Sequence, residues 1–536
     1  MKNSVERFSV RGLTGPSGTR YIELRNSSDG CLLRLSDVAN SKGGLEQALG
    51  RHGIIISPRE RTVLMEQMSN LTDYPEITMA EQPGWTKSGC FINAKGELIA
   101  ADRDARPPLV AFVPADGGYG ASGTLEEWRR EVADRLAGQT LICFLVMAAF
   151  AGAVLALTSR TLNILFEVVG QRGGEGKSTA QALAASVLGC PYDSGKGTYQ
   201  FKPHGTANWL ESCTEMFADS TMILDEIQLF AADQAPTPRT KMLHDLVMRL
   251  AERQSKGRFD HRLPFFVRMV VISSANESIR DLMSSRLPHL LGPTVSRLIS
   301  LPADLGYGAG VFDFVPKGYE TSRAFAETLK AAAKSYHGTA IQAFLGKLVK
   351  LRADDEGVLL TGIEQRITEF LDAAGVDAND GLSGRVAEAF AIVAVAGRLA
   401  KRAGVLPDRW DPQEIALACY RSHAAAAARS EGKPIRAVLR AYAARSDIII
   451  LNTGEYPDLS DDAWKASSGL LRSCHGQREL RVPPSMIYKV FPDWTSRKTS
   501  PEMKDFLISE RGRFDIKRRV RAGRGKERVI VFANFD

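Results

Sequence analysis

The chain of 536 residues is 44% hydrophobic and 24% charged, an ordinary globular composition that excludes disordered and fibrous classes. At about 150 residues per domain, this length predicts three or four domains. The seven cysteines are scattered without a CxxC pair, and the eight histidines show no metal-ligand spacing. This argues against a disulfide framework and a zinc site, and predicts a cytoplasmic location.

The formal net charge of +7 is concentrated near the C-terminal end. Between Arg511 and Arg528, nine Lys and Arg residues face two acids, an excess equal to the charge of the whole chain. A neutral body with a basic end predicts an anionic polymer as partner. A solvated basic tail is the alternative.

Residues 1–120 predict an N-terminal α+β module. Its expected elements are a strand at Arg20–Leu24, a helix at Gly44–His52 and a hairpin over 84–99 that turns at 94–96. The proline- and glycine-containing stretch 107–123 marks the boundary of the module. Thr124 then begins a helix, in capping-box spacing with Glu127.

One apolar run, Leu141–Leu157, is uncharged and just short of the roughly 18 residues that flag a membrane span. It is rich in alanine and leads directly into the next expected strand. We expect a buried helix here, because a single short membrane span would place the polar segments before and after it on opposite sides of the membrane. No membrane partner is expected.

Residues 121–315 alternate between apolar strands and helices. The expected strands are Leu162–Val169, Thr221–Leu224 and Val267–Ser273, and the expected helices are Lys177–Leu188 and a segment from Met242 to Ala251. Strands separated by helices predict an α/β core whose parallel sheet is covered on both faces.

The segment Gly170–Ser178 follows a strand and opens a helix, the context that a phosphate-binding loop (P-loop) requires. Its glycines let backbone N–H groups turn inward around phosphates, and the helix N-terminus adds a partial positive charge. We expect ATP as ligand, with Lys177 on its β and γ phosphates and Ser178 on Mg²⁺. The residues expected to hold ATP are Gly173, Gly174, Glu175, Gly176, Lys177, Ser178 and Thr179. Five residues separate Gly170 from Gly176, where the standard pattern has four, and a chance Gly-Lys-Ser is the alternative.

Polar residues at the ends of the later strands would complete a hydrolysis site. Asp225 is expected to hold Mg²⁺ and Glu226 to polarise the attacking water, since two adjacent acids ending a buried strand need a cation. Asn276 is the first choice for orienting that water and Ser274 the second, on a strand expected between the other two. Arg297 is expected to act on the ATP of a neighbouring subunit. The alternatives are an asparagine that only ends a strand and an arginine in a surface salt bridge.

From about residue 316 to 445 the pattern is almost purely helical, and the last stretch, 446–536, changes again. Its expected elements are short helices at Pro484–Val490 and Pro501–Arg511, then a hairpin of Arg513–Arg521 with Glu527–Phe532. Helix, helix and basic hairpin predict a winged-helix DNA-binding domain.

Two basic segments are expected to bind DNA phosphates, the first just before the strand at 267–273 and the second in the C-terminal hairpin. These residues are Lys256, Arg258, Arg262, Lys517, Arg518, Arg519, Arg521 and Arg524. Such binding should weaken steeply with salt. Aromatic residues are not interleaved with these basic residues, so we do not expect base stacking to dominate. An exposed helix end and turn is the alternative for the first segment.

Seven segments together carry a resemblance to a known family. They are Gly84-Trp85, Gly123–Trp128, the P-loop, Leu224–Ile227, Lys256–Arg258, Val295–Leu301 and Phe390–Ala400. The chain resembles AAA+ ATPases and, more narrowly, the bacterial domain-of-unknown-function family nine-two-seven, over most of residues 80–410. That family occurs on phages and integrative elements, and includes cassette-chromosome helicases similar to mini-chromosome-maintenance motors. The resemblance implies an ATP-driven ring helicase, a hexamer of this chain, that acts on single-stranded or forked DNA in replicating a mobile element.

Three functions stay open at this point. The first is a helicase or translocase, and the second is an ATP-dependent initiator, loader or sensor that hydrolyses ATP without unwinding DNA. The third is a structural DNA-binding protein with an inactive nucleotide site. The intact Lys177, Asp225 and Glu226 argue against the third.

Overall fold

The chain forms two compact units. The larger comprises Met1–Gln234, Met242–Ser278 and Thr294–His423, and the smaller comprises Ala235–Lys241, Ile279–Pro293 and Ala424–Asp536. The computed structural model describes residues 8–535 except 27–29, 40–42, 51, 103, 113, 116–117, 162, 193–196, 204–206, 254–265, 288–289, 291–293, 295–296, 377–380, 431–434, 452–455, 475–476, 492–493, 495–497, 499–501, 511–512 and 523–525.

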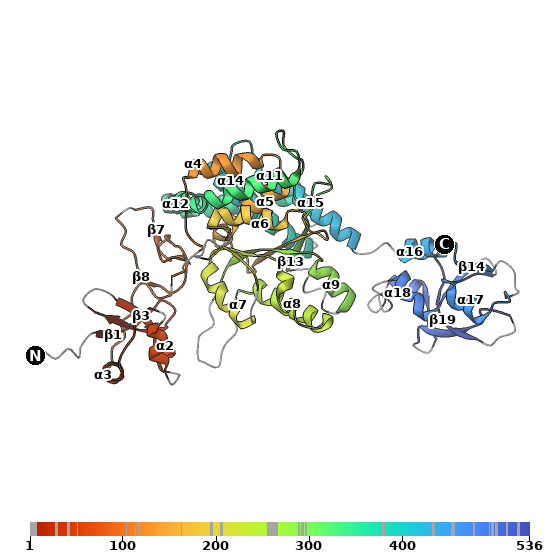
Figure 1. The fold of residues 1–536 in the computed structure, drawn as a ribbon, viewed down its shortest axis with the longest axis horizontal. Coiled ribbons are helices and arrows are strands. Elements are labelled where there is room, and N and C mark those ends of the chain that lie inside the picture. Colours follow the sequence, from red (N-terminus) through yellow and green to blue (C-terminus); the bar gives the residue numbers. More distant parts are fainter. Residues whose placement is uncertain are drawn as a thin grey trace, which may run out of the picture. The chain divides into compact units, whose positions relative to one another are not determined.

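The larger unit begins with a three-stranded antiparallel sheet and three helices (Figure 1). The strands are β1 (Ser9–Thr14), β2 (Arg20–Arg25) and β3 (Gly30–Arg34), and the helices are α1 (Leu35–Ala39), α2 (Gly44–Gly50) and α3 (Pro58–Ser69). A capping box of Ser57 and Glu60 begins α3. Ile22, Leu33 and Leu49 belong to the apolar core of this module. The strand expected at 20–24 is confirmed, and the helix expected at 44–52 is confirmed as far as Gly50.

Short strands follow. They are β4 (Met79–Ala80), which pairs in parallel with β8 (Leu109–Val110), and the antiparallel set β5 (Gly84–Trp85), β6 (Phe91–Ile92) and β7 (Leu98–Ile99). The carboxamide oxygen of Asn93 holds the β6–β7 turn by accepting from the backbone N–H groups of Lys95 and Glu97 at 3.0 and 2.9 Å. The hairpin expected over 84–99 is therefore confirmed, with one strand more than expected.

A five-stranded parallel sheet forms the centre of the larger unit. Its order is β10 (Gln200–Phe201), β11 (Ser220–Leu224), β12 (Met269–Ala275), β9 (Ile164–Val169) and β13 (Leu298–Pro302). The long strands are almost wholly buried, as strands covered on both faces must be. The expectation that β12 lies between β9 and β11 is confirmed.

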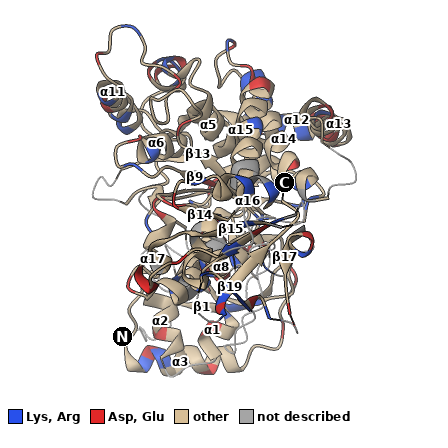
Figure 2. Ribbon diagram, turned by 90° about the vertical axis from the view of Figure 1, so that its right-hand side faces the viewer, with Lys and Arg blue, Asp and Glu red and all other residues tan. Residues whose placement is uncertain are grey.

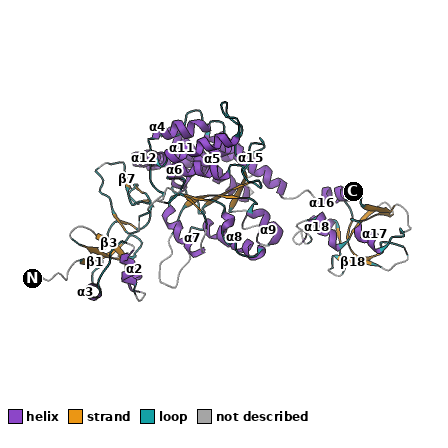
Figure 3. Cartoon of the chain, in the orientation of Figure 1, coloured by secondary structure: helices purple, strands orange, loops and turns teal. Residues whose placement is uncertain are grey.

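Helices lie on both faces of this sheet (Figures 1 and 3). On one face are α5 (Thr140–Leu155) and α6 (Lys177–Leu188), and on the other are α7 (Ala207–Thr214) and α8 (Pro236–Ala251). Every residue of α5 from Leu141 to Leu155 is buried, which confirms the expected buried helix. Across the described part of the chain, no helix combines the length and apolar character that a membrane crossing requires.

Of the remaining helices that lie wholly or partly in the larger unit, α11, α12 and α14 pack onto α5 and α6. The remaining helices are α4 (Leu125–Trp128), η1 (Arg129–Ala133), η2 (Asp134–Leu136), η3 (Glu215–Phe217), η4 (Ile227–Leu229), α11 (Ser322–Ser335), α12 (Thr339–Asp354), α13 (Glu356–Ala374), α14 (Gly381–Arg402) and α15 (Pro412–Ser430). Thr124 caps α4 through the expected capping box, and the buried Trp128 indole donates to Ser186 Oγ of α6 at 3.0 Å. Phe390 of α14 contacts Phe144 of α5 and Phe166 of β9. The helical pattern expected over 316–445 is confirmed.

The smaller unit is built on a six-stranded sheet. The order is β14 (Ile448–Leu451), β15 (Gly469–Cys474), β16 (Gln477–Val482), β19 (Glu527–Phe532) and β17 (Leu507–Ile508), and β18 (Asp515–Arg518) also pairs with β19. Its helices are α9 (Ile279–Arg286), α16 (Ile435–Ala443), α17 (Asp461–Ala466), η6 (Pro484–Met486), α18 (Ile487–Val490) and η7 (Glu502–Asp505). One apolar core contains Leu480 and Phe532, and a second core, which contains Leu470, Trp464 and Val529, lies against the other face of the sheet.

The C-terminal elements differ in part from expectation. The hairpin is confirmed, because β18 pairs antiparallel with β19. The helix expected over 501–511 is wrong in its second half, where Leu507 and Ile508 form a strand paired with Phe532 and Val531. Short apolar runs pack equally well as helix or strand, so periodicity could not separate the two. Strands β14, β15 and β16 were not expected, and the winged-helix assignment stays a prediction.

Candidate functional site

The P-loop segment lies between β9, which ends at Val169, and α6, which begins at Lys177. The Gly170 N–H donates to the carbonyl of Ala275 at the end of β12, at 3.1 Å. Gly174 and Gly176 have φ values of 86° and 89°, a left-handed backbone region that glycine enters without steric cost. The expected strand–loop–helix context is therefore confirmed.

Lys177, the expected phosphate lysine, is folded back on its own loop. Its Nζ donates to the carbonyl of Gly170 at 2.5 Å and lies 3.9 Å from Glu175 Oε2. This ammonium group must leave the Gly170 carbonyl to reach a phosphate. The neighbouring Thr179 is buried within the first turn of α6.

Oxygen atoms from three elements meet beside the loop. Ser178 Oγ of α6 donates to Asp225 Oδ1 at 3.3 Å, and Ser274 Oγ of β12 donates to the same oxygen at 3.2 Å. The parallel register places Leu224 opposite Ser273, so Asp225 and Ser274 leave the same edge of the sheet. A hydroxyl and a carboxylate are the hard oxygen donors that Mg²⁺ prefers, and this pair fits the ion.

Glu226 follows Asp225 in a conformation that is rare for residues other than glycine. Its φ and ψ are 51° and 66°, and its side chain is exposed. The Glu226 N–H donates to Ser274 Oγ at 3.0 Å, which helps to hold this turn. Backbone strain of this kind costs about 1–3 kcal/mol and clusters at functional sites, and here it turns the carboxylate away from the buried strand.

The other two expected catalytic residues flank strands of the same sheet, but at opposite edges of it. Asn276 is exposed one residue beyond β12, and its N–H donates to Gln228 Oε1 at 3.4 Å. Arg297 directly precedes β13, which pairs with the P-loop strand on the side opposite β12. The three strands that carry the P-loop, Asp225 and Asn276 thus adjoin one another. Arg297 precedes a fourth strand at the opposite edge of the sheet, because Leu298 pairs with Leu165 near the start of β9, whereas the P-loop follows the end of β9.

Sequence reasoning missed one buried polar residue of the site. Gln181 is fully buried on α6, and its Nε2 donates to the Leu224 carbonyl at 2.8 Å. This bond joins the P-loop helix to the residue before Asp225. The signal was available: a polar residue one helical turn after Ser178 interrupts the face that packs on the sheet.

The basic residues expected on DNA are only partly described. Lys256, Arg258, Arg262 and Arg524 lie outside the described residues. Lys517 and Arg519 are exposed, whereas Arg518 is paired with Glu510 at 2.7 Å. Figure 2 shows Lys and Arg on the strands of the smaller unit and acidic residues on α17.

The structure corrects the expectation for Arg521. This residue is 3% exposed, and its guanidinium is paired with Asp461 of α17 at 2.6 Å and also with Glu527 of β19. A buried arginine with two carboxylate partners is not available to a phosphate. Arg521 therefore joins the hairpin to α17 instead of facing DNA.

A second ionic cluster fixes the small sheet of β5 to β7 against the core. Asp219 accepts from the Trp85 N–H and from Arg268 Nε, both at 2.9 Å. Burial raises the pKa of Asp219 above its usual value, although Arg268 opposes this shift. The Trp85 indole N–H also donates to the carbonyl of Ala153 at 3.0 Å. These contacts serve packing, away from the P-loop.

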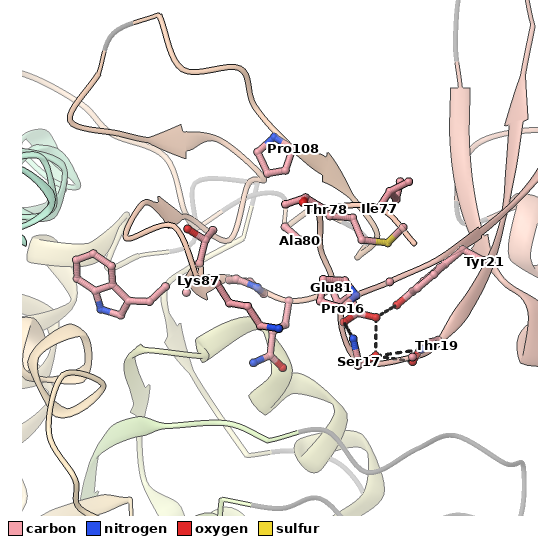
Figure 4. Close-up of a pocket in the computed structure, with 18 of the residues that line it drawn as sticks. Pro16, Ser17, Thr19, Tyr21, Ile77, Thr78, Ala80, Glu81, Lys87 and Pro108 are labelled. Atoms are coloured by element: carbon pink, nitrogen blue, oxygen red, sulfur yellow. Dashed lines mark hydrogen bonds between the residues drawn. The ribbon is translucent and has the colours of Figure 1, made fainter. Parts of the chain in front are cut away.

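A cavity of about 1560 Å³ lies elsewhere in the larger unit. It is lined by the β1–β2 turn, by residues 76–88 and by core residues that include Arg268. Figure 4 shows the Glu81 carboxylate inside it, accepting from the hydroxyls of Ser17 and Tyr21 at 2.6 and 3.0 Å. No P-loop residue is among its described lining, so this cavity is separate from the P-loop.

Comparison with known proteins agrees with this picture. Residues 39–261 match the family described as "Domain of unknown function (DUF927)", a range that includes the P-loop and Asp225. No curated protein matches the chain.

The fold is similar to that of a solved structure described as "SCCmec type IV Cch - active helicase". The TM-score is 0.60 at 16% sequence identity, with 98% of this chain and 92% of that chain covered. A second solved structure, the apo A form of the NrS-1 C-terminal region, has a TM-score of only 0.22 at 9% identity over 68% of this chain and 77% of that one. The predicted resemblance to family nine-two-seven is thus confirmed: residues 39–261 match the DUF927 model, and the fold is similar to that of the Cch helicase.

Proposed function

We propose that this protein is an ATP-dependent DNA helicase or translocase of the AAA+ class. The observation that carries the proposal is the meeting of Ser178, Asp225 and Ser274 within hydrogen-bond distance beside a glycine loop, at one edge of three adjacent parallel strands. The strand order, with β12 between the P-loop strand and the Asp225 strand, supports the AAA+ assignment. Similarity to a protein described as an active helicase supports unwinding.

The residues of the site take separate roles in this proposal. The N–H groups of Gly173 to Gly176 and Lys177 bind the phosphates of ATP, and Ser178 and Asp225 hold Mg²⁺. Bound Mg²⁺ supplies positive charge to the β and γ phosphate oxygens. Glu226 accepts a proton from the attacking water, for which its exposed carboxylate is placed at the rim of the site. Asn276, from the intervening strand, orients that water.

Arg297 extends the proposal to an oligomer. An arginine supplied by a neighbour stabilises the charge that develops in phosphoryl transfer, worth about 10³–10⁵ in rate. Arg297 precedes β13 at the sheet edge opposite the P-loop, and two strands separate β13 from the strand that ends at Asp225, so we assign it to the ATP of an adjacent subunit in a hexameric ring. Mixing Arg297→Ala with Lys177→Ala subunits tests this: mixed rings should regain activity, and inactive mixtures would refute shared sites.

DNA is the proposed substrate of the motor, in replication of a phage or integrative element. The basic hairpin of β18 and β19, which we interpret as the wing of a winged helix, and the segment that contains Lys256, Arg258 and Arg262 would supply phosphate contacts. The concentration of the whole net charge in residues 511–528 supports this.

A strand-displacement assay on forked DNA tests the proposal. We expect the wild-type protein to separate labelled strands with ATP and Mg²⁺, and the Lys177→Ala variant to separate none. Hydrolysis of ATP without separated strands would refute the helicase and would indicate the initiator, loader or sensor instead. Equal strand separation by Lys177→Ala would refute the site assignment.

A further inference from the structure

The loop that follows β13 is bonded to the P-loop segment at both of its ends. The Ala303 N–H donates to the carbonyl of Val169, the last residue before the P-loop, at 2.7 Å. The Val311 N–H donates to the carbonyl of Glu175, near the other end of the P-loop, at 2.9 Å. We call the residues between these two contacts, 304–310, the β13 loop. Because both of its ends are fixed in this way, the β13 loop lies beside the P-loop.

The two loops are in close contact. A Cβ on Gly176 would lie 2.6 Å from Val311 Cγ2, and a Cβ on Gly310 would lie 2.4 Å from the Glu175 carbonyl oxygen. Both glycines also have positive φ values, 89° and 67°, which glycine adopts without steric cost. A side chain at either position would push the two loops apart, so the sequence favours their contact.

The β13 loop is also ordered from within. The Asp304 carboxylate accepts from the backbone N–H groups of Gly306 and Tyr307, both at 2.8 Å, and from that of Gly308 at 3.0 Å. These bonds hold the backbone before, at and after Tyr307. A side chain on a backbone that is already fixed loses less conformational freedom when it binds a ligand.

Tyr307 is the large side chain that this loop exposes. The residue is 61% exposed, and among the described residues none forms a hydrogen bond, an ion pair or a ring contact with its side chain. A single exposed aromatic residue is ordinary on a protein surface. The argument therefore depends on where Tyr307 lies, which is next to the P-loop.

The sheet order places the β13 loop on the side of the P-loop away from the proposed Mg²⁺ site. Asp225 follows β11, and two strands, β12 and β9, separate β11 from β13. Mg²⁺ bridges the β and γ phosphates of a bound nucleotide, so these phosphates would lie toward Asp225. The nucleoside is attached to the other end of the triphosphate and would extend toward β13 and its loop.

We propose that the Tyr307 ring stacks on the purine base of ATP, and that the β13 loop forms one wall of the nucleoside subsite. The ring is apolar, exposed and carried on an ordered backbone, which are the properties of a stacking platform for a base. A purine is favoured over a pyrimidine because its two fused rings cover more of the tyrosine ring. The proposal rests on the P-loop being the nucleotide site.

The test compares a nucleotide with a ligand that has the phosphates but no nucleoside. Isothermal titration calorimetry with Mg²⁺ gives the affinity of the full chain for the non-hydrolysable ATP analogue AMP-PNP and for inorganic tripolyphosphate. Tyr307→Ala should weaken AMP-PNP binding about tenfold, as expected for one lost base–aromatic stack, and should leave tripolyphosphate binding unchanged. Tyr307→Phe keeps the ring and should bind AMP-PNP like the wild type.

Phe266→Ala is the matched control. Phe266 is another aromatic residue of the larger unit and is 60% exposed, but it lines the cavity that is separate from the P-loop. Its replacement should leave both affinities unchanged. Thermal unfolding checks that each variant folds. If Tyr307→Ala does not fold, Tyr307→Leu decides, because it keeps an apolar side chain without an aromatic ring and should also weaken AMP-PNP alone.

Each failure of the proposal has its own signature. Wild-type AMP-PNP affinity in a folded Tyr307→Ala variant would refute the stacking contact while leaving the P-loop assignment intact. An equal loss of AMP-PNP and tripolyphosphate affinity would mean that Tyr307 supports the P-loop and contacts no base. A wild-type protein that binds neither ligand would refute the proposed function itself.

Discussion

Replacing Ser274 tests the proposed Mg²⁺ site while its proposed ligands, Ser178 and Asp225, stay unchanged. Ser274 is buried, with 1% of its surface exposed. Its Oγ donates to Asp225 Oδ1 at 3.2 Å and accepts from the Glu226 N–H at 3.0 Å. It therefore orients both acidic residues of the site. Replacing Ser274 by Ala leaves the Asp225 carboxylate without one donor and the Glu226 N–H without its acceptor.

The expected size of the effect follows from these two bonds. A hydrogen bond to a charged group contributes about 1.5–3 kcal/mol, and groups that hold a metal ligand from behind change metal affinity by about 10- to 100-fold. We expect Ser274→Ala to raise the Mg²⁺ concentration for half-maximal ATP hydrolysis by about that factor. The assay is steady-state ATP hydrolysis over a Mg²⁺ series at saturating total ATP.

Ser273→Ala is the control for this measurement. Ser273 precedes Ser274 on the same strand and is equally buried, at 1% exposure, but its hydroxyl donates to the backbone carbonyl of Phe166 at 3.1 Å. Loss of the Ser273 hydroxyl should lower the free energy of unfolding by about 0.5–1.5 kcal/mol. It should leave the Mg²⁺ concentration for half-maximal ATP hydrolysis unchanged. Equal Mg²⁺ curves for the two variants would refute the role of Ser274.

Three further changes have defined outcomes. Glu226→Gln should retain ATP binding but lower the rate of hydrolysis by about 10²–10⁴-fold, seen as ATP retained by the protein on a filter; rapid turnover would exclude Glu226 as the base. Glu175→Gln should tighten ATP binding, because it removes a negative charge and a partner 3.9 Å from Lys177 Nζ; a fluorescent ATP analogue measures this, and weaker binding would contradict it. Gly152→Ala should lower the melting temperature strongly, since an added Cβ would lie 2.0 Å from the Ser220 carbonyl, whereas Gly346→Ala on α12, with nothing within 4 Å, should not destabilise.

Much of the core could be predicted from the sequence because its signals are local. The apolar run before Gly170, the glycine loop and the helix from Lys177 follow from the chain order alone, and parallel pairing then brings Asp225 to the same edge. The preference for Asn276 over Ser274 stays untested. Sequence could not show that the Ser274 side chain turns toward Asp225, because that depends on the register between β11 and β12.

The smaller unit was predicted less well, because its strands have weak sequence patterns and its ion pairs join residues far apart in the chain. Strands β15 and β16 are short and carry arginines such as Arg472 and Arg481 on one face, which weakens the apolar pattern that marks a strand. Strand β14 is a run of four apolar residues, Ile448–Leu451, and periodicity cannot separate a strand from a helix in so short a run. The burial of Arg521 could not be predicted from the sequence either, because its partner Asp461 lies 60 positions earlier in the chain. Basic residues that look alike in sequence are thus divided by the fold into ion pairs and exposed charges.

The most direct test of the central claim is steady-state ATP hydrolysis by the full chain, with and without single-stranded and forked DNA. A motor that acts on DNA through this P-loop should hydrolyse ATP slowly alone and faster with either DNA, and Lys177→Ala should abolish both rates. Hydrolysis that DNA leaves unchanged, or that persists in Lys177→Ala, would contradict the account.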